Sequence, residues 1–393
     1  MKIENLDLRG KRVLVRVDFN VPVEGGQVKD NRRIKGAKPT LDLLLNQGAR
    51  VVLISHRGRP KGQYKEEFSM GPVLEETEKV LGRKVQAFFS PQVVNDQIIA
   101  QAQALEDGQV ALLENLRFRP EEEANDPDFA KDLAKLGDIF INDAFGTAHR
   151  SHASNVGVAQ YLPSYLGLLV GREVSVLSEL LDRADKPYLT ILGGSKVSDK
   201  IGIIENLLDK VDGIMIVGAM ANTFLEAQGY AMGRSLVEKD KIDLAKDLLD
   251  RAKKAQVQVF LPRDLVVAED LEAKEGQVVA IEAMDPDRMA LDIGPKTLEA
   301  AKVFLAPAKT VMWNGPAGVF EKEAFSQGTM GLAKILSQLD AKTVVGGGDS
   351  AAAVAQSGLE DSFYHISSGG GASLEFLEGN KLPALAAILG EEA

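Results

Sequence analysis

The stretch Leu192-Gly193-Gly194-Ser195-Lys196-Val197-Ser198-Asp199-Lys200 indicates how the second half of the chain folds. The apolar run 188–192 predicts a strand buried on both faces, and apolar residues recur at helical spacing from Ile201 onward. A glycine turn between a strand and a helix exposes backbone N–H groups, an arrangement that favours phosphate. Lys196 and Lys200 are four apart, so on a helix both ammonium groups would extend from one face. A plain strand-to-helix connection with two surface lysines also fits this stretch taken alone.

Length and composition limit the class of protein. The chain has 393 residues, which is long for a single core and predicts two domains. The absence of cysteine excludes disulfides and thiolate chemistry and fits a reducing compartment. No stretch approaches a membrane span and no signal peptide begins the chain, so we expect a cytoplasmic protein with no membrane partner. The net charge of -11 argues against nucleic acid as a partner, because it repels a polyanion.

Polar residues follow the first predicted strand, 11–17. Asp18 and Asn20 come directly after it and before Pro22, which ends the strand pairing. In open α/β sheets this carboxyl edge is where ligands bind. Arg33 falls near a helix start, where a cation is mildly unfavourable, which suggests that it meets an anion. A surface arginine is the alternative at this position.

Basic residues recur at the other strand ends of the first half. The strand 51–54 is followed by His56-Arg57-Gly58-Arg59. The apolar strand before this run, together with Gly58 and Pro60 within the loop, favours an anion-binding loop over a solvated charge cluster. Strands 110–113 and 138–142 lead to further basic loops. The basic side chains at equivalent positions are Arg33, His56, Arg59, Arg117 and Arg150. Together they predict a shared pocket for a small anion that carries several charges.

Glycine loops also end the strands of the second half. Gly346–Gly348 lets the backbone approach a phosphate chain, and Asp349 or Ser350 can cap the helix that follows. Asp349 is the best carboxylate for Mg²⁺, which takes one or two carboxylates together with phosphate oxygens; a plain helix cap is the alternative. Segment 267–292 is polar and irregular. A P-loop and a dinucleotide fingerprint are both missing, and His149 with His152 has no carboxylate cluster to complete a zinc site.

Several long motifs together resemble the phosphoglycerate kinase family, in order and over essentially the whole chain. They are the runs 16–22, 55–60, 146–150, 193–200, 313–321 and 346–350. The resemblance implies an α/β protein of two similar-sized Rossmann-like domains, doubly wound with mostly parallel sheets, joined by a hinge helix. It implies magnesium-dependent phosphoryl transfer from 1,3-bisphosphoglycerate to ADP, giving 3-phosphoglycerate and ATP in glycolysis, and we expect a monomer.

Domain boundaries follow from the same resemblance. We expect an N-terminal 3-phosphoglycerate-binding domain over 1–171 and an interdomain helix over 172–186. The C-terminal nucleotide-binding domain is expected over 187–372, and a segment over 373–393 is expected to return to the first domain. The hinge is predicted near the helix and near the glycines at 369–371.

Site residues carried over from the family fall on matching positions of this sequence. The substrate ligands are Asp18, Phe19, Asn20, Arg33, His56, Arg57, Gly58, Arg59, Arg117 and Arg150. The nucleotide ligands are Gly193, Gly194, Lys196, Lys200, Gly294, Asn314, Glu321, Gly347, Gly348, Asp349 and Ser350. Asp349 is the metal carboxylate, and the catalytic residues are Arg33, Lys196 and Lys200. The sequence departs from the family at Arg57, where an apolar residue is common, and at Ser350 and Ser368, where threonine is frequent.

The residues agree with this chemistry. Phosphoryl transfer needs positioning and charge neutralisation, and the accepting carboxylate is already ionised, so the absence of an obvious general base is informative. We expect Arg33 and Lys200 to flank the migrating group. Two other classes remain open: a kinase for a different carboxylate, and a non-catalytic phosphosugar-binding protein, which would need neither Lys200 nor the Asp349 loop.

Overall fold

The computed structural model describes residues 2–390, which form two compact units. The N-terminal unit extends to Ser175 and includes the segment that begins at Lys381, whereas the C-terminal unit comprises Val176–Asn380. The first boundary falls inside the helix α6 (Leu168–Asp182). The second falls after α13 (Gly371–Leu377), later than the return at 373 that the sequence suggested.

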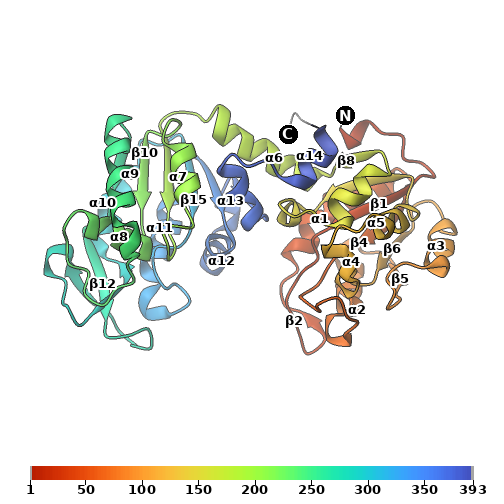
Figure 1. Cartoon of the computed structure of the whole chain (residues 1–393), viewed down its shortest axis with the longest axis horizontal. Helices are drawn as coiled ribbons and strands as arrows, with labels where there is room; N and C mark the ends of the chain where they lie inside the picture. The colour runs from red at the N-terminus through yellow and green to blue at the C-terminus, as the bar shows by residue number, and fades with distance from the viewer. Residues whose placement is uncertain (1, 391–393) are drawn as a thin grey trace. The chain divides into compact units, whose positions relative to one another are not determined.

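The N-terminal unit, coloured mainly red to yellow in Figure 1, is built on a parallel sheet of six strands in the order β5-β6-β4-β1-β7-β8. The strands are β1 (Arg12–Val17), β4 (Arg50–Ile54), β5 (Gln86–Phe88), β6 (Val110–Leu113), β7 (Ile139–Asp143) and β8 (Ser164–Leu166). A two-stranded ribbon of β2 (Val23–Glu24) and β3 (Gln27–Val28) precedes the first helix. Because all six strands run parallel, their carboxyl ends share one edge.

Both faces of this sheet are covered. Alternate residues of β1 enter different apolar clusters: Val13 and Val15 join one, and Leu14 joins the other. This is the pattern of a strand buried on both sides. The helices of the unit are α1 (Arg32–Asn46), α2 (Gly71–Leu81), α3 (Asp96–Gln103), α4 (Pro120–Glu123), α5 (Pro127–Ala134) and α14 (Pro383–Leu389). Ala384 at the start of α14 donates from its N–H to the carbonyl of Ala148 at 3.1 Å, so the chain end packs on this unit.

The C-terminal unit repeats the design with the order β11-β10-β9-β15-β16-β17, again parallel. Its strands are β9 (Tyr188–Leu192), β10 (Gly213–Ile216), β11 (Gln258–Phe260), β15 (Thr310–Asn314), β16 (Lys342–Gly346) and β17 (His365–Ile366). Its other helices are α7 (Ile201–Leu207), α8 (Ala219–Ala227), α9 (Ile242–Lys254), α10 (Pro295–Leu305), α11 (Gln327–Leu336) and α12 (Gly348–Ser357). The two sheets confirm the predicted α/β class with two doubly wound units.

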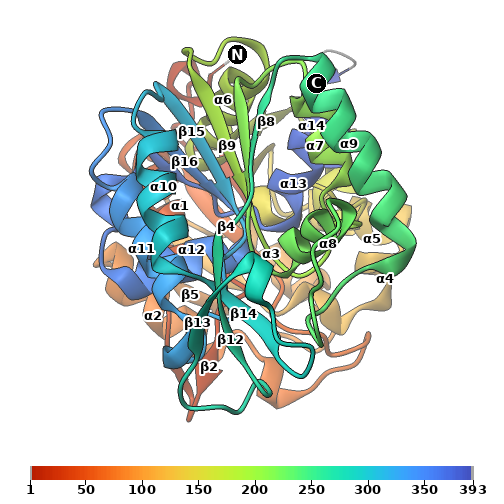
Figure 2. The same ribbon diagram turned by 90° about the vertical axis from the view of Figure 1, so that its left-hand side faces the viewer.

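A second sheet in the C-terminal unit was not predicted. The antiparallel strands β12 (Asp264–Ala268), β13 (Gln277–Ala280) and β14 (Met289–Ile293) pair in the order β13-β12-β14. Figure 2 shows them beyond one end of the larger sheet. The description of 267–292 as irregular was therefore wrong. Buried and exposed residues do not alternate along β13, so the sequence lacks the period-two pattern by which a strand is predicted.

The helix α6 begins at Leu168, earlier than the predicted start at 172. Its first N–H groups are held by side chains from the N-terminal unit: Asp143 Oδ1 accepts from Leu169 at 3.0 Å and from Val170 at 3.3 Å. Burial raises the pKa of Asp143 to about 6. These acceptors come from far along the sequence, so a local pattern does not reveal where the helix starts.

Candidate active site

The loop after β1 is fixed to neighbouring loops at the carboxyl edge of the N-terminal sheet. Asp18 forms an ion pair with Arg33 in the first turn of α1. Phe19 donates its N–H to Ser55 Oγ at 2.9 Å, and Asn20 Oδ1 accepts the N–H of Gly58 at 2.9 Å. The Arg33 side chain remains 41% exposed, so its guanidinium is accessible to a ligand.

A buried amide, Asn115, joins the loops that follow β4 and β6. Its Oδ1 accepts the N–H of Arg57 at 3.0 Å and that of Arg117 at 3.1 Å. Arg117 donates from Nη1 to the carbonyl of Gly58 at 2.9 Å. Gly58 has a φ of 61° and a Cβ there would lie 2.4 Å from the ring of Phe68, so only glycine fits. The loops thus form one rigid edge.

Most of the predicted basic side chains act on one another electrostatically. Burial lowers the pKa of His56 well below its ordinary value, and nearby cations lower it further. Burial is also the main cause of the lowered pKa of Arg117. The cations that act on these two groups are Arg16, Arg33, Arg59 and Arg150. Such a concentration of like charge favours a bound anion with several charges.

Arg57 differs from this group. Its guanidinium donates from Nη1 to the carbonyl of Ser69 at 2.7 Å and lies near Glu114 and Glu67. It is 8% exposed, and it is not among the main causes of the lowered pKa of His56. The structure therefore directs this predicted ligand toward the protein interior rather than toward the other basic groups.

Three buried polar residues beneath this edge were missed by the sequence reasoning. Arg16 is fully buried, Glu122 is fully buried, and His152 is 9% exposed. Burial lowers the pKa of His152 to about 3, and adjacent arginines add to the effect. A charged residue inside the apolar run of β1 was the available signal for Arg16. Among residues 2–390 no cluster of three or more His, Asp or Glu side chains could hold a metal ion.

In the C-terminal unit, the loops after β9 and β15 are packed backbone to backbone. Gly193 donates its N–H to the carbonyl of Asn314 at 2.8 Å, and Gly194 donates to that of Pro316 at 3.1 Å. A Cβ on Gly193 would lie 2.2 Å from the Pro316 carbonyl oxygen. The glycines therefore allow two strand ends to approach closely. The sequence predicted that this turn exposes its backbone N–H groups, but those of Gly193 and Gly194 are donated to these carbonyls instead.

The prediction that Lys196 and Lys200 extend from one helix face is wrong, because α7 begins only at Ile201. Lys196 lies exposed in the preceding loop, whereas Lys200 is 8% exposed and donates from Nζ to Asn314 Oδ1 at 2.5 Å. Burial lowers the pKa of Lys200.

The reason for the late helix start is Glu238, which comes from a distant loop. Its Oε2 accepts the N–H of Val197 at 2.5 Å and that of Ser198 at 3.1 Å, while Oε1 accepts the Ser198 hydroxyl at 2.6 Å. The carboxylate thus holds this segment as a loop. It also shows that the backbone here binds an anionic group.

The glycine loop after β16 leads into α12. Gly347, with a φ of 88°, is the N-cap, so the prediction that Asp349 or Ser350 caps the helix is wrong. The Ser350 hydroxyl instead accepts the N–H of Gly315 at 2.6 Å, which joins this loop to the β15 loop. Asp349 is exposed in the first turn of α12, and Gly348 is exposed beside it.

A hollow of about 580 Å³ opens beside these loops, and it is mostly apolar. Of the predicted nucleotide residues it is lined by Gly194, Glu321 and Asp349. The apolar lining residues that the sequence reasoning missed include Leu236, Leu265, Leu271, Met289, Leu291 and Val319. Gly294 is not part of the lining; it precedes α10, where a Cβ would lie 2.3 Å from the Asp264 carboxylate. Because Leu265 belongs to β12 and Met289 and Leu291 belong to β14, the small antiparallel sheet supplies part of the wall of this hollow.

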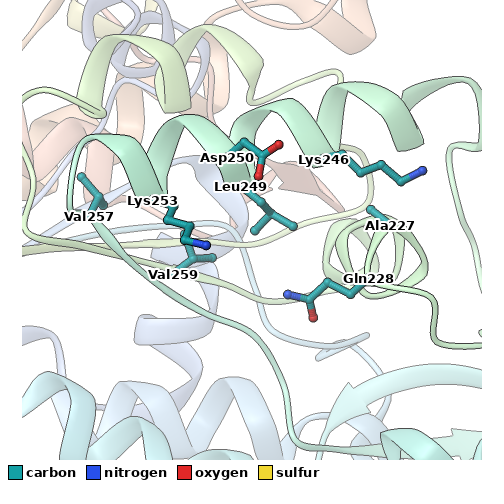
Figure 3. Close-up of a pocket in the computed structure, with 8 residues that line it drawn as sticks. All are labelled: Ala227, Gln228, Lys246, Leu249, Asp250, Lys253, Val257 and Val259. Atoms are coloured by element: carbon teal, nitrogen blue, oxygen red, sulfur yellow. The ribbon is translucent and has the colours of Figure 1, made fainter.

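A second hollow of about 560 Å³ lies between α8, α9 and β11 (Figure 3). It contains none of the predicted site residues. Its two lysines, Lys246 and Lys253, come from α9, and Figure 3 shows that their amino groups do not converge. This hollow therefore lacks the arrangement of the anion-binding edges.

Comparisons with known proteins agree over the whole chain. The family profile described as "Phosphoglycerate kinase" matches residues 3–380. A phosphoglycerate kinase of Moorella thermoacetica is 54% identical over 389 residues, which cover 99% of this chain and 98% of the relative. The phosphoglycerate kinase structure from Coxiella burnetii has a TM-score of 0.89 and 42% identity, covering 99% and 98% of the two chains. That from Pyrococcus horikoshii has a TM-score of 0.83 and 32% identity, with the same coverage.

Proposed function

The chain belongs to the phosphoglycerate kinase family and catalyses phosphoryl transfer between 1,3-bisphosphoglycerate and ADP, and we propose that each of its two units binds one of the substrates. The N-terminal unit binds 3-phosphoglycerate or 1,3-bisphosphoglycerate. The C-terminal unit binds ADP or ATP. The observation that carries this division is the cluster of mutually repelling cations around His56 in one unit and the glycine-lined, mostly apolar hollow in the other.

The acid substrate matches the cation cluster in charge. The cluster supports Arg33, His56, Arg59, Arg117 and Arg150 as its ligands, because guanidinium groups pair well with phosphate and carboxylate oxygens. Asp18 orients Arg33, and Asn20 fixes the His56 loop through Gly58. Phe19 and Gly58 serve through their backbone. Arg57 contributes to loop structure through Ser69.

The residues proposed to bind the nucleotide form two groups, one for the phosphates and one for the nucleoside. The phosphates are proposed to meet Lys196, Lys200, the turn at 193–194 and the N-terminal turn of α12 at 347–350. At the α12 turn, backbone N–H groups and the helix dipole favour anions. Glu321 and the apolar wall of the hollow are proposed to hold the nucleoside. Asn314 orients Lys200, and Gly294, at the start of α10, is proposed to let the backbone approach the nucleotide.

Magnesium is proposed to arrive with the nucleotide. Mg²⁺ binds through one or two carboxylates with phosphate oxygens and water, and Asp349 is an exposed carboxylate in the lining of the hollow. When bound, the ion neutralises phosphate charge.

The chemistry itself requires no protein base. The acceptor is a carboxylate that is ionised at neutral pH, so transfer depends on in-line placement and on positive charge around the migrating group. Arg33 and Lys200 are proposed to supply that charge, with Lys196 assisting. Burial makes the Lys200 charge more effective, because a low-dielectric setting strengthens its field.

Domain closure is part of the proposal, since in-line transfer needs reacting atoms about 3–3.5 Å apart. Closure would also exclude water from the acyl phosphate. We propose hinges at α6 and near 369–371. Small-angle scattering should detect a smaller radius of gyration with both substrates bound than with either alone; an unchanged radius would contradict closure.

The protein is further proposed to act as a cytoplasmic monomer. It contains no cysteine, which fits a reducing compartment. Within the described part of the chain, no helix has the length and apolar character to cross a membrane. Light scattering on the purified chain would test the monomer.

Steady-state kinetics tests the assignment of the two sites. His56→Ala should raise KM for 3-phosphoglycerate about tenfold, the loss expected for one good hydrogen bond, and leave KM for ATP unchanged. Equal increases in both KM values would contradict the placement of the acid at the His56 loop.

A further inference from the structure

A buried polar chain lies directly behind the acid-binding edge of the N-terminal unit. Glu122 and Ser154 are fully buried, Arg16 is fully buried, and His56 is 4% exposed. Ser154 Oγ lies 2.6 Å from Glu122 Oε1 and 2.9 Å from Arg16 Nε. Arg16 Nη2 in turn lies 3.1 Å from His56 Nδ1. The chain therefore runs from a carboxylate to a histidine at the proposed ligand site.

The direction of each hydrogen bond follows from the arginine. A guanidinium group carries only donors and stays protonated in proteins. Arg16 Nε must therefore donate to Ser154 Oγ, so the serine uses its own proton toward Glu122. Arg16 Nη1 donates to the carbonyl of Val17. By the same rule Nη2 donates to His56 Nδ1, which must be an unprotonated acceptor.

The protonation state of the second ring nitrogen then follows. Burial and the neighbouring arginines hold the pKa of His56 well below its ordinary value, so the ring is neutral at physiological pH. A neutral imidazole carries one N–H. Because Nδ1 accepts from Arg16, that proton is on Nε2.

We propose that Arg16 is a positioning residue that fixes His56 as the neutral Nε2–H tautomer, so that the ring presents a hydrogen-bond donor to the acid substrate. The inference rests on the proposed function, in which His56 contacts 3-phosphoglycerate. The matching ligand chemistry is an ionised oxygen of phosphate or carboxylate, which accepts a hydrogen bond. The other tautomer would turn a lone pair toward that oxygen and repel it.

The arrangement also explains why a charged residue is buried in β1. A histidine donor binds an anion without adding another positive charge to a site that already contains Arg33, Arg117 and Arg150. Glu122 balances the charge of Arg16 through Ser154, and Ser154 also donates its N–H to Glu122 Oε2 at 3.0 Å. Buried groups of opposite charge that are linked in this way are weak support for stability but can fix one arrangement of side chains.

Nitrogen NMR of the protein labelled with ¹⁵N-histidine tests the tautomer in the absence of any substrate. The sequence has only four histidines, and the His56→Gln variant identifies the signals of His56. The expected result is one species with a protonated Nε2 and an unprotonated Nδ1. A ring protonated at Nδ1, doubly protonated, or averaged between tautomers at neutral pH would overturn the proposal.

A charge-balanced double variant tests the role of Arg16. Arg16→Met with Glu122→Gln removes the donor to Nδ1 without leaving one buried charge unpaired. The matched control is Arg12→Met with Asp138→Asn, which removes an ion pair at the opposite end of the same strand. Only the first pair should give a measurable Nδ1–H population and raise KM for 3-phosphoglycerate about tenfold, with KM for ATP unchanged.

Two results would contradict the role of Arg16: a pure Nε2–H tautomer in the double variant, or equal effects in the control. If the double variant does not fold, the spectrum of the unaltered protein still decides the tautomer, and Ser154→Ala, which frees Arg16 Nε, should broaden or shift the Nδ1 signal. A correct tautomer combined with an unchanged KM in His56→Gln would contradict the proposed substrate contact and leave the tautomer assignment intact.

Discussion

Lys200 donates a hydrogen bond of 2.5 Å from Nζ to Oδ1 of Asn314 at the end of β15. The partner is a neutral amide, so the positive charge of this largely buried lysine is oriented without being neutralised by direct contact. Asp199, Asp349 and Glu378 act on it from greater distance. A preorganised, partly desolvated charge of this kind is suited to stabilising a migrating phosphoryl group.

Lys200→Ala should therefore lower kcat by about 10²- to 10⁴-fold and weaken ADP binding much less, because the charge matters most in the transition state. Lys253→Ala, on α9 beside the hollow of Figure 3, is the control and should change neither quantity. Steady-state kinetics and calorimetry provide the two measurements. An unchanged kcat with a raised KM for ADP would make Lys200 a binding residue only.

Glu238→Gln should loosen the loop that carries Lys196. The carboxylate accepts two backbone N–H groups and one hydroxyl there, and a neutral amide oxygen accepts them less strongly. We expect KM for ADP to rise about three- to tenfold, with KM for 1,3-bisphosphoglycerate unchanged. Glu226→Gln, which alters a surface ion pair with Lys239, is the matched control. Wild-type kinetics in Glu238→Gln would show that this contact does not order the nucleotide site.

Asp349→Asn should weaken binding of the magnesium–ADP complex while metal-free ADP binds as before, because only the metal needs the carboxylate. Calorimetric titrations with and without Mg²⁺ measure both affinities. Asp361→Asn, an exposed aspartate of the same unit, is the control. If both forms of ADP lose affinity equally, Asp349 acts through the helix terminus instead of through the metal.

His152 should make stability depend on pH. Its pKa is about 3 in the folded protein against 6.5 for the free side chain, so the unfolded chain takes up a proton first as pH falls. The contribution is complete above pH 6.5 and is lost as pH falls toward 3, by up to about 1.4 kcal/mol per pH unit. Urea unfolding at several pH values should show a smaller loss of stability toward acid in His152→Gln. Identical pH dependence would indicate that His152 is not buried in its neutral form.

The anion-binding edge of the N-terminal unit could be predicted because its residues follow apolar strands directly. Parallel strands bring such positions to one edge, so His56 and Arg117 could be grouped from local patterns alone, whereas Arg33 was singled out by its place near a helix start. Arg57 shows the limit of this reasoning. Arg57 lies in the same loop as His56 and Arg59, so the sequence pattern does not distinguish it from them. The direction of its guanidinium depends on the position of the Ser69 carbonyl.

The nucleotide hollow was harder to predict because distant segments build it. Leu265, Leu291 and Val319 are ordinary apolar residues whose common surface depends on how β12, β14 and the β15 loop pack. The start of α7 likewise depends on Glu238, far along the chain. Helical spacing of the apolar residues gives no sign of such an acceptor.

Hydrogen–deuterium exchange with each ligand separately tests the division of substrates between the units most directly. With 3-phosphoglycerate alone, protection should increase in the loops at 18–20, 55–59 and 115–117, all in the N-terminal unit. With magnesium–ADP alone, it should increase at 193–200, 315–319 and 347–350, all in the C-terminal unit. Protection of the C-terminal loops by 3-phosphoglycerate, with the N-terminal loops unchanged, would contradict the account.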